Sequence, residues 1–279
     1  MKTVFDSVSY TCSRTVTEHY STSFLLAARM LGASIRADIH NIYGFVRFAD
    51  EIVDSFHDYD KRYLFNKFEE DLEDALEQKI SLNPILNSFQ HTFFKYNIPL
   101  SLVTSFLGSM RMDLDKTAPF NHREYTDYIH GSAEVVGAMC LKVFVKGDLE
   151  AYNKLERPAM ALGSAFQKVN FLRDLKTDFK DLNRSYFPNT DLNTLNETAK
   201  KRIIQEIEAN FELGYSGIAQ LPREAKFGVY MAYKYYYKLL QKLKRTPPME
   251  IRNRRIRVPN YQKFGLLATS YIHYRLKMV

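Results

Sequence analysis

The sequence of 279 residues has no tryptophan, only two cysteines, and few glycines and prolines. Cys12 and Cys140 have neither the spacing of a metal site nor the density of a disulfide scaffold, so we expect reduced thiols and a cytoplasmic location. The 11 glycines and 9 prolines form no linker rich in Pro, Gly or Ser. The absence of such a linker predicts a single domain that spans residues 1–279.

The sequence also lacks a long apolar run. No uninterrupted apolar stretch approaches the roughly 18 residues that a transmembrane helix needs. Polar side chains interrupt residues 1–15 too often for a signal peptide. We therefore expect a soluble protein, or one that binds the inner face of the membrane peripherally.

Alternating strand patterns are nearly absent, whereas the 3.6-residue periodicity of amphipathic helices recurs along the chain. The helices that this periodicity predicts span residues 21–32, 34–56, 61–79, 83–95, 100–112, 122–145, 149–178, 197–220, 222–244 and 259–277. Asp191, Asn193 and Asn196 are expected to form the loop or the cap before the helix that starts near residue 197. The pattern predicts a single all-α domain.

The composition is basic and rich in two aromatic residue types. A formal net charge of +7 and a pI near 9.1 suit an anionic partner, which leaves nucleic acid, anionic lipid headgroups and phosphorylated substrates open. The 19 tyrosines and 20 phenylalanines indicate thick helix packing or an apolar cavity lined in part by aromatic rings.

Segment 41–56 carries a polar stripe on an otherwise apolar helix. At a helical spacing, one narrow face presents Tyr43, Arg47, Asp50 and Asp54. Burying two carboxylates is costly unless they are paired or bound to a metal. One interpretation is an ion network of the arginine with the aspartates. The other is a Mg²⁺ site, because Mg²⁺ takes one or two carboxylates and completes its shell with water and phosphate oxygens.

Segment 163–188 repeats this arrangement. Its stripe consists of Gln167, Asn170, Asp174 and Asp178, and Arg173 and Arg184 nearby can neutralise phosphate oxygens. An exposed charged face is the alternative interpretation of a lone stripe. Two such stripes, both flanked by apolar residues and arginines, favour a site in which metal ions assist the ionisation of an allylic diphosphate.

Six short motifs follow one another along most of the chain. They are STSF (21–24), YGFVRFADEIVD (43–54), MRMDL (110–114), YIHGSAEVVGAMC (128–140), QKVNFLRDLKTD (167–178) and RSYFP (184–188). In this order they resemble the squalene and phytoene synthase family, the head-to-head trans-isoprenyl diphosphate synthases. The resemblance implies an all-helical isoprenoid-synthase fold with a central cavity between two aspartate-lined walls.

The resemblance also implies individual roles. The implied metal ligands, for Mg²⁺ or alternatively Mn²⁺, are Asp50, Asp54, Asp113, Asp174 and Asp178. The implied substrate-binding residues are Ser21, Ser23, Arg47, Gln167, Asn170, Arg173 and Arg184. The implied catalytic residues, which would lie near the diphosphate or a carbocation, are Tyr43, Tyr128, Tyr186 and Tyr236.

The sequence departs from the family pattern in three places. Glu51 stands where many members have a second aspartate, and Thr22 stands where a basic residue is often found. Lys176 and Thr177 lie where an acidic residue often precedes the last aspartate. The four principal aspartates remain.

The implied activity is that of a phytoene synthase, a Mg²⁺-dependent prenyltransferase of carotenoid biosynthesis that joins two geranylgeranyl diphosphates head to head through prephytoene diphosphate. Ala27, Ala28 and Gly32 would leave room for long prenyl chains, and without a dinucleotide motif we expect no NADPH. The alternative is a squalene or dehydrosqualene synthase that uses farnesyl diphosphate. A non-catalytic assembly or binding relative would be expected to lose the aspartates. A nucleic-acid binder would leave both stripes unexplained, so we expect no nucleic-acid partner.

Two further segments allow more than one interpretation. Small residues cluster between Gly131 and Ala138, which indicates close helix packing or a helix that bends beside the substrate chains. The basic stretch 242–258 is expected to be a solvated loop, with a flap that reaches the diphosphate or a patch on anionic lipid as alternatives. The sequence leaves the oligomeric state open.

Overall fold

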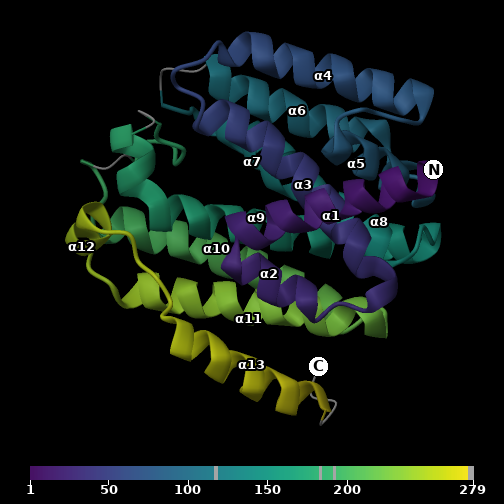
Figure 1. The fold of residues 1–279 in the computed structure, drawn as a ribbon. Helices are drawn as coiled ribbons and strands as arrows, with labels where there is room; N and C mark the ends of the chain where they lie inside the picture. Colours follow the sequence, from purple (N-terminus) through teal and green to yellow (C-terminus); the bar gives the residue numbers. More distant parts are fainter. Residues whose placement is uncertain (116–118, 182–183, 191–192, 276–279) are drawn as a thin grey trace.

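The computed structural model describes residues 1–115, 119–181, 184–190 and 193–275, and its regular structure within these ranges is helical throughout (Figure 1). The first helices are α1 (Lys2–Tyr20), α2 (Thr22–Arg29), α3 (Ala33–Asp54), α4 (Lys61–Gln78), α5 (Pro84–Lys95) and α6 (Leu100–Asp115). There follow α7 (His122–Ile129), the π-helical turn η1 (His130–Glu134), α8 (Val135–Phe144), α9 (Leu149–Asp181), α10 (Glu197–Ile218), α11 (Arg223–Arg245), α12 (Pro248–Asn253) and α13 (Asn260–Arg275). The predicted all-α class is confirmed. Across the described ranges, every helix is too short or too polar to cross a membrane.

Most predicted helices are confirmed to within a few residues, but α1 and α12 were missed. The side chains that α1 buries are Ser9, Ser13 and Thr17, so no apolar periodicity marks this helix in the sequence. Small hydroxyls instead let α1 lie close to α3 and α5. The hydroxyls of Ser13 and Ser88 are 2.7 Å apart, and a Cβ on Gly44 would lie 2.9 Å from the Ser13 hydroxyl.

The start of α10 follows the sequence prediction. The Asn196 side chain accepts a hydrogen bond from the backbone N–H of Ala199 at 2.9 Å, as a capping residue does. Asp191, which precedes it, lies outside the described residues.

Helix α3 runs through the first of two large hydrophobic cores. It contacts α1, α4, α5, α6 and α8, and it is buried almost all round, as its sequence predicts. The Phe45 ring lies 4.0 Å from that of Phe89 and 5.5 Å from that of Phe106, measured between centroids. The second core joins α9, α10 and α11 around residues such as Phe211. The functional cavities lie between these two cores.

The helix predicted over residues 122–145 is interrupted, because η1 separates α7 from α8. Glycines here let backbones approach closely. A Cβ on Gly131 would lie 2.5 Å from the Ser105 carbonyl oxygen, and one on Gly163 would lie 2.5 Å from that of Ala133. Close packing is therefore the role of these glycines. The π-helical turn also changes the course of the chain beside the central cavity, which Ser132 and Ala133 line.

We expect opposite effects from two glycine-to-alanine changes in helices. Gly163→Ala should lower the free energy of unfolding by about 1–3 kcal/mol, because α9 must move away from η1. Gly108→Ala on the exposed face of α6, where the added Cβ meets nothing within 4 Å, should raise it by about 0.5–1 kcal/mol. Urea denaturation of both variants checks this, and equal effects would contradict the packing described here.

Candidate active site

A polar cavity of about 820 Å³ lies between α3 and α9. It brings together most of the predicted site residues, although they are far apart in the sequence. Those that line it are Ser21, Ser23, Tyr43, Arg47, Asp50, Asp54, Tyr128, Gln167, Asn170, Arg173, Asp174, Asp178, Tyr186 and Tyr236. The two aspartate stripes thus face a common space, as the sequence predicts. The individual roles of these residues stay predictions.

On the α3 wall, each carboxylate lies beside an arginine. Arg47 Nη1 donates to Asp50 Oδ2 at 2.6 Å, and the same guanidinium pairs with Glu51. The Arg47 guanidinium also lies 4.5 Å from the centre of the Tyr20 ring. Glu51 therefore holds this arginine from the position where many relatives carry an aspartate.

Arg184 connects three acidic residues behind the cavity. Its Nη1 lies 2.5 Å from Asp54 Oδ1 and 3.6 Å from Asp113 Oδ2, and its backbone N–H donates to the Asp178 carbonyl oxygen at 2.8 Å. Asp113 is buried and accepts a hydrogen bond of 2.5 Å from the Tyr128 hydroxyl. Asp113 and Arg184 thus lie beneath the lining rather than in it, where they position Asp54 and Tyr128.

On the α9 wall, two arginines hold Asp174. Arg173 pairs with it from the adjacent position, and Arg255 Nε lies 2.7 Å from Asp174 Oδ1. Sequence reasoning did not name Arg255 as a site residue. It belongs to the basic stretch 242–258, and residues 255–259 line the cavity, which favours the flap interpretation of that stretch.

A lysine from α13 reaches the place where the family pattern has a basic residue. Lys263 lines the polar cavity, and its Nζ donates to the Thr22 hydroxyl at 3.2 Å. The sequence distance of 241 residues hid this relation. A cation therefore lies beside Ser21 and Ser23 despite the departure at Thr22.

Burial and mutual repulsion make the carboxylates hard to ionise. Burial, followed by the charges of Asp174 and Asp54, raises the pKa of Asp178 to about 8. Burial raises the pKa of Asp113 to about 7 although Arg184 and Tyr128 oppose the rise. The pKa of Asp50 is also raised, by burial first and then by Asp54. Without a bound cation, the protonated form of these carboxyl groups is therefore favoured near neutral pH.

Divalent cations fit this arrangement. The buried Asn170 Oδ1 in the cavity lining has no hydrogen-bond partner among the described residues, so this oxygen is available as a ligand. No group of three or more acidic, histidine or cysteine side chains in those residues is placed to hold a metal ion. Mg²⁺ binds through one or two carboxylates and takes other oxygens from water and substrate phosphates, so a pair such as Asp50 and Asp54 would be enough.

The candidate tyrosines are packed against aromatic rings. Tyr43 stacks on Phe24 with centroids 4.6 Å apart, and Tyr236 stacks on Phe166 at 4.2 Å. Burial raises the pKa of Tyr43 to about 12, so its hydroxyl is a neutral hydrogen-bond donor near pH 7. These ring faces can stabilise a nearby cation through their quadrupoles.

The polar cavity continues into an apolar one of about 320 Å³. Phe24, Tyr43, Gln167 and Tyr236 are among the residues that line both. Beyond them most of the wall consists of small or aliphatic residues, including Ala27, Ala28, Gly137, Gly163, Gly214, Gly217 and Gly228. Gly32, which was grouped with Ala27 and Ala28 as space for prenyl chains, lines a different pocket.

Comparisons of the sequence agree with this geometry. The sequence model of the squalene/phytoene synthase family matches residues 17–262. Phytoene synthase of Arthrospira platensis is 26% identical over 297 aligned residues, which cover 97% of this chain and 94% of that protein. Phytoene synthase of Mycobacterium tuberculosis is 24% identical over 67% of this chain and 60% of that protein.

Solved structures share the fold. A dehydrosqualene synthase in complex with a ligand superposes with a TM-score of 0.81 at 19% identity, over 97% of this chain and 98% of that one. A squalene synthase from Alicyclobacillus acidocaldarius superposes with a TM-score of 0.75 at 21% identity, over 87% and 95% of the two chains. The predicted isoprenoid-synthase fold is therefore confirmed.

The raised pKa values predict how stability depends on pH without metal or substrate. Asp178 and Asp113 hold protons up to about pH 8 and 7 in the folded state, whereas unfolded aspartates lose them near pH 4. The folded state then binds more protons, so the free energy of unfolding should fall as pH rises from about 4 to 8.

Asp178→Asn should make this decline shallower, and Asp74→Asn on exposed α4 should leave it unchanged. Mg²⁺ should stabilise the wild type more at high pH, because it binds the ionised carboxylates. Urea unfolding across this pH range is the measurement. A stability that rises with pH would contradict the repulsion among these groups.

Proposed function

Because this chain belongs to the squalene/phytoene synthase family, we propose that it is a prenyltransferase that condenses two isoprenoid diphosphates head to head. One observation carries the proposal: two aspartate walls face a polar cavity that opens into an apolar cavity lined by small residues. The polar end suits diphosphates and the apolar end suits prenyl chains. The family and the curated relatives, whose names are those of phytoene synthases, support the same activity.

In this proposal, Asp50 and Asp54 on one wall and Asp174 and Asp178 on the other would hold Mg²⁺, with Mn²⁺ as an alternative. When bound, the metal stabilises the negative charge that develops on a leaving diphosphate. Arginines that now neutralise these aspartates would become free to contact phosphate oxygens. The buried Arg47 Nε has no hydrogen-bond partner in the described structure and is ready to donate.

The reaction follows in two stages. One geranylgeranyl diphosphate ionises, and its allylic cation alkylates the double bond of the other; proton loss then closes the cyclopropyl ring of prephytoene diphosphate. That intermediate ionises, rearranges and loses a proton to give phytoene. Tyr43 and Tyr236 border both cavities, where their rings can stabilise the cations. A cavity tyrosine or an oxygen of the released diphosphate would take the proton.

Geranylgeranyl diphosphate is the proposed substrate because Ala27 and Ala28 leave the apolar cavity wide beside Phe24. The last step of this reaction is the loss of a proton, which needs no reductant, so we propose no use of NADPH. Farnesyl diphosphate is the second candidate, because structural neighbours carry the names of squalene and dehydrosqualene synthases. A non-catalytic role is disfavoured because the aspartates are intact, and nucleic-acid binding would not use them.

Removal of one carboxylate from either wall should greatly lower turnover without unfolding the protein. Asp50→Asn and Asp174→Asn should each lower kcat/KM at least about 100-fold, because charge stabilisation of the leaving diphosphate is lost. Asp74→Asn, on exposed α4, is the matched control and should retain full activity. Folded Asp50→Asn and Asp174→Asn proteins with wild-type turnover would refute the site.

The product decides between the candidate reactions. Purified protein is incubated with Mg²⁺ and either geranylgeranyl or farnesyl diphosphate, with and without NADPH, and the hydrocarbon is analysed by mass. We expect a forty-carbon product from geranylgeranyl diphosphate without NADPH. A thirty-carbon product would support the farnesyl alternative, and folded protein that makes no hydrocarbon from either substrate would support a non-catalytic role.

The apolar cavity should set the chain length. Ala28 is buried in its wall, so Ala28→Phe fills space that a long prenyl chain needs. We expect the ratio of kcat/KM for geranylgeranyl over farnesyl diphosphate to fall about tenfold or more. Ala28→Ser, which adds little volume, is the control. An unchanged ratio in Ala28→Phe would show that the chains lie elsewhere.

A further inference from the structure

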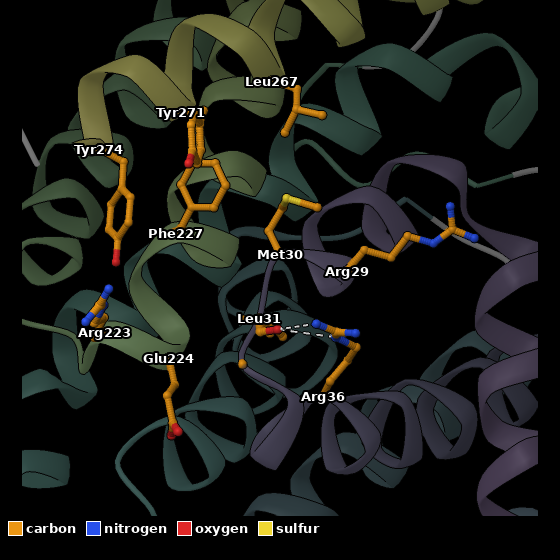
Figure 2. Close-up of a pocket in the computed structure, with 11 residues that line it drawn as sticks. Arg29, Met30, Leu31, Arg36, Arg223, Glu224, Phe227, Leu267, Tyr271 and Tyr274 are labelled. Carbon is orange, nitrogen blue, oxygen red and sulfur yellow. Dashed lines mark hydrogen bonds between the residues drawn. The ribbon is translucent and has the colours of Figure 1, made fainter. Parts of the chain in front are cut away.

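A third cavity, of about 740 Å³, opens on the outside of the molecule, between the α2–α3 connection, the start of α11, and α13 (Figure 2). Met30, Phe227 and Leu267 face one another across it, and Arg29 and Arg223 lie on its two sides. The aspartates of the polar cavity are not among its lining residues. We call this cavity the outer pocket.

One side chain is common to the walls of the outer pocket and the apolar cavity. Leu31 lines both. Along α11, Phe227 faces the outer pocket and Gly228 faces the apolar cavity. A Cβ on Gly228 would lie 2.4 Å from Leu31 Cδ2, so this leucine packs directly on the α11 backbone. The wall at this point is therefore thin, and it lies on the α11 side of the cavity.

The charge around the outer pocket is positive. Arg29 is half exposed, and its nearest described carboxylate, that of Glu18, is 4.0 Å away. Arg36 donates to the Leu31 carbonyl oxygen at 2.7 Å and keeps its full charge. The acidic lining residue, Glu224, is neutralised by Lys146 at 2.6 Å. Exposed Arg223 completes a surface that attracts anions.

Helix α13 extends this surface with exposed aromatic residues. It packs on α11 at the edge of the molecule (Figure 1). Tyr261 is 73% exposed and Tyr271 is 51% exposed, and Tyr271 also lines the outer pocket. Tyrosine favours the interface between water and membrane, because its ring is apolar and its hydroxyl is polar. Arginines beside exposed tyrosines suit anionic headgroups and the acyl region beneath them.

We propose that the outer pocket and α13 dock the protein on an anionic lipid bilayer, and that the hydrocarbon product leaves the apolar cavity past Leu31 into the lipid. The product route rests on the proposed function, whereas the docking does not. The basic stretch 242–258 is a weaker candidate for the docking surface, because its Arg255 is turned toward Asp174 in the polar cavity.

The test separates the docking from the catalysis. The full chain is sedimented with vesicles of phosphatidylcholine alone or with phosphatidylglycerol added. The wild type should bind the anionic vesicles, and Arg29→Glu/Arg223→Glu should bind at least about tenfold more weakly. The control Lys67→Glu/Arg123→Glu makes the same change of charge at exposed sites on α4 and α7 and should bind as the wild type does.

Turnover is then measured with and without the anionic vesicles. Steady-state turnover of the wild type should rise with vesicles, whereas that of Arg29→Glu/Arg223→Glu should not, and the first turnover should be equal in both. Equal binding to both vesicle types, or an equal loss of binding in the control, overturns the docking. A change of oligomeric state in Arg29→Glu/Arg223→Glu without any lipid effect overturns it in favour of a protein interface. Binding without any hydrocarbon product leaves the docking standing and refutes the product route.

Discussion

Four aspartates on α3 and α9 are held around one cavity, and the repulsion among them constrains the rest of the site. Burial removes the water that would solvate these charges, and the neighbouring carboxylates add repulsion, which is why the pKa values of Asp50 and Asp178 are raised. The fold holds the carboxylates together because Arg47, Arg173 and Arg184 pair with carboxylates around the cavity. Because of these ion pairs, the ligand-free protein avoids unpaired buried charges, which would cost several kcal/mol each.

The same ion pairs could be replaced by contacts with a bound ligand. Each arginine–aspartate pair is an internal substitute for the two interactions that a metal diphosphate would make, one with the carboxylate and one with the guanidinium. Binding then replaces one set of charge-assisted contacts with another and leaves no charge uncompensated. Arg255 has a particular place in this exchange, because it reaches Asp174 from the segment before α13 and not from a rigid wall helix. Its release would couple occupancy of the polar cavity to the position of that segment.

The sequence predicts the parts of the site that are local along a helix. The stripes that end in Asp54 and Asp178 follow from helical spacing, and burial of α3 follows from its apolar composition. The parts of the structure that the sequence does not predict depend on contacts between distant segments. Lys263 reaches Thr22 from the other end of the chain, and α1 is fixed by hydroxyls with no apolar period. Interruption by η1 is equally hidden, because a single π turn inside a helical run changes only the backbone hydrogen-bond pattern and has no residue signature of its own.

The polar cavity and the apolar cavity together form a path with one charged end and one apolar end. In the proposed reaction, charge would hold a prenyl diphosphate at the polar end, and its chain would lie along small residues such as Ala28 and Gly163. A hydrocarbon without its diphosphate has no attraction to the polar end, and that end would expose it to charged walls. Contact with apolar side chains would be most favourable at the opposite wall, where Leu31 lines both the apolar cavity and the outer pocket. Loss of the diphosphate in the proposed reaction would thus remove the interaction that retains the molecule, and a lipid phase beyond Leu31 would make departure favourable.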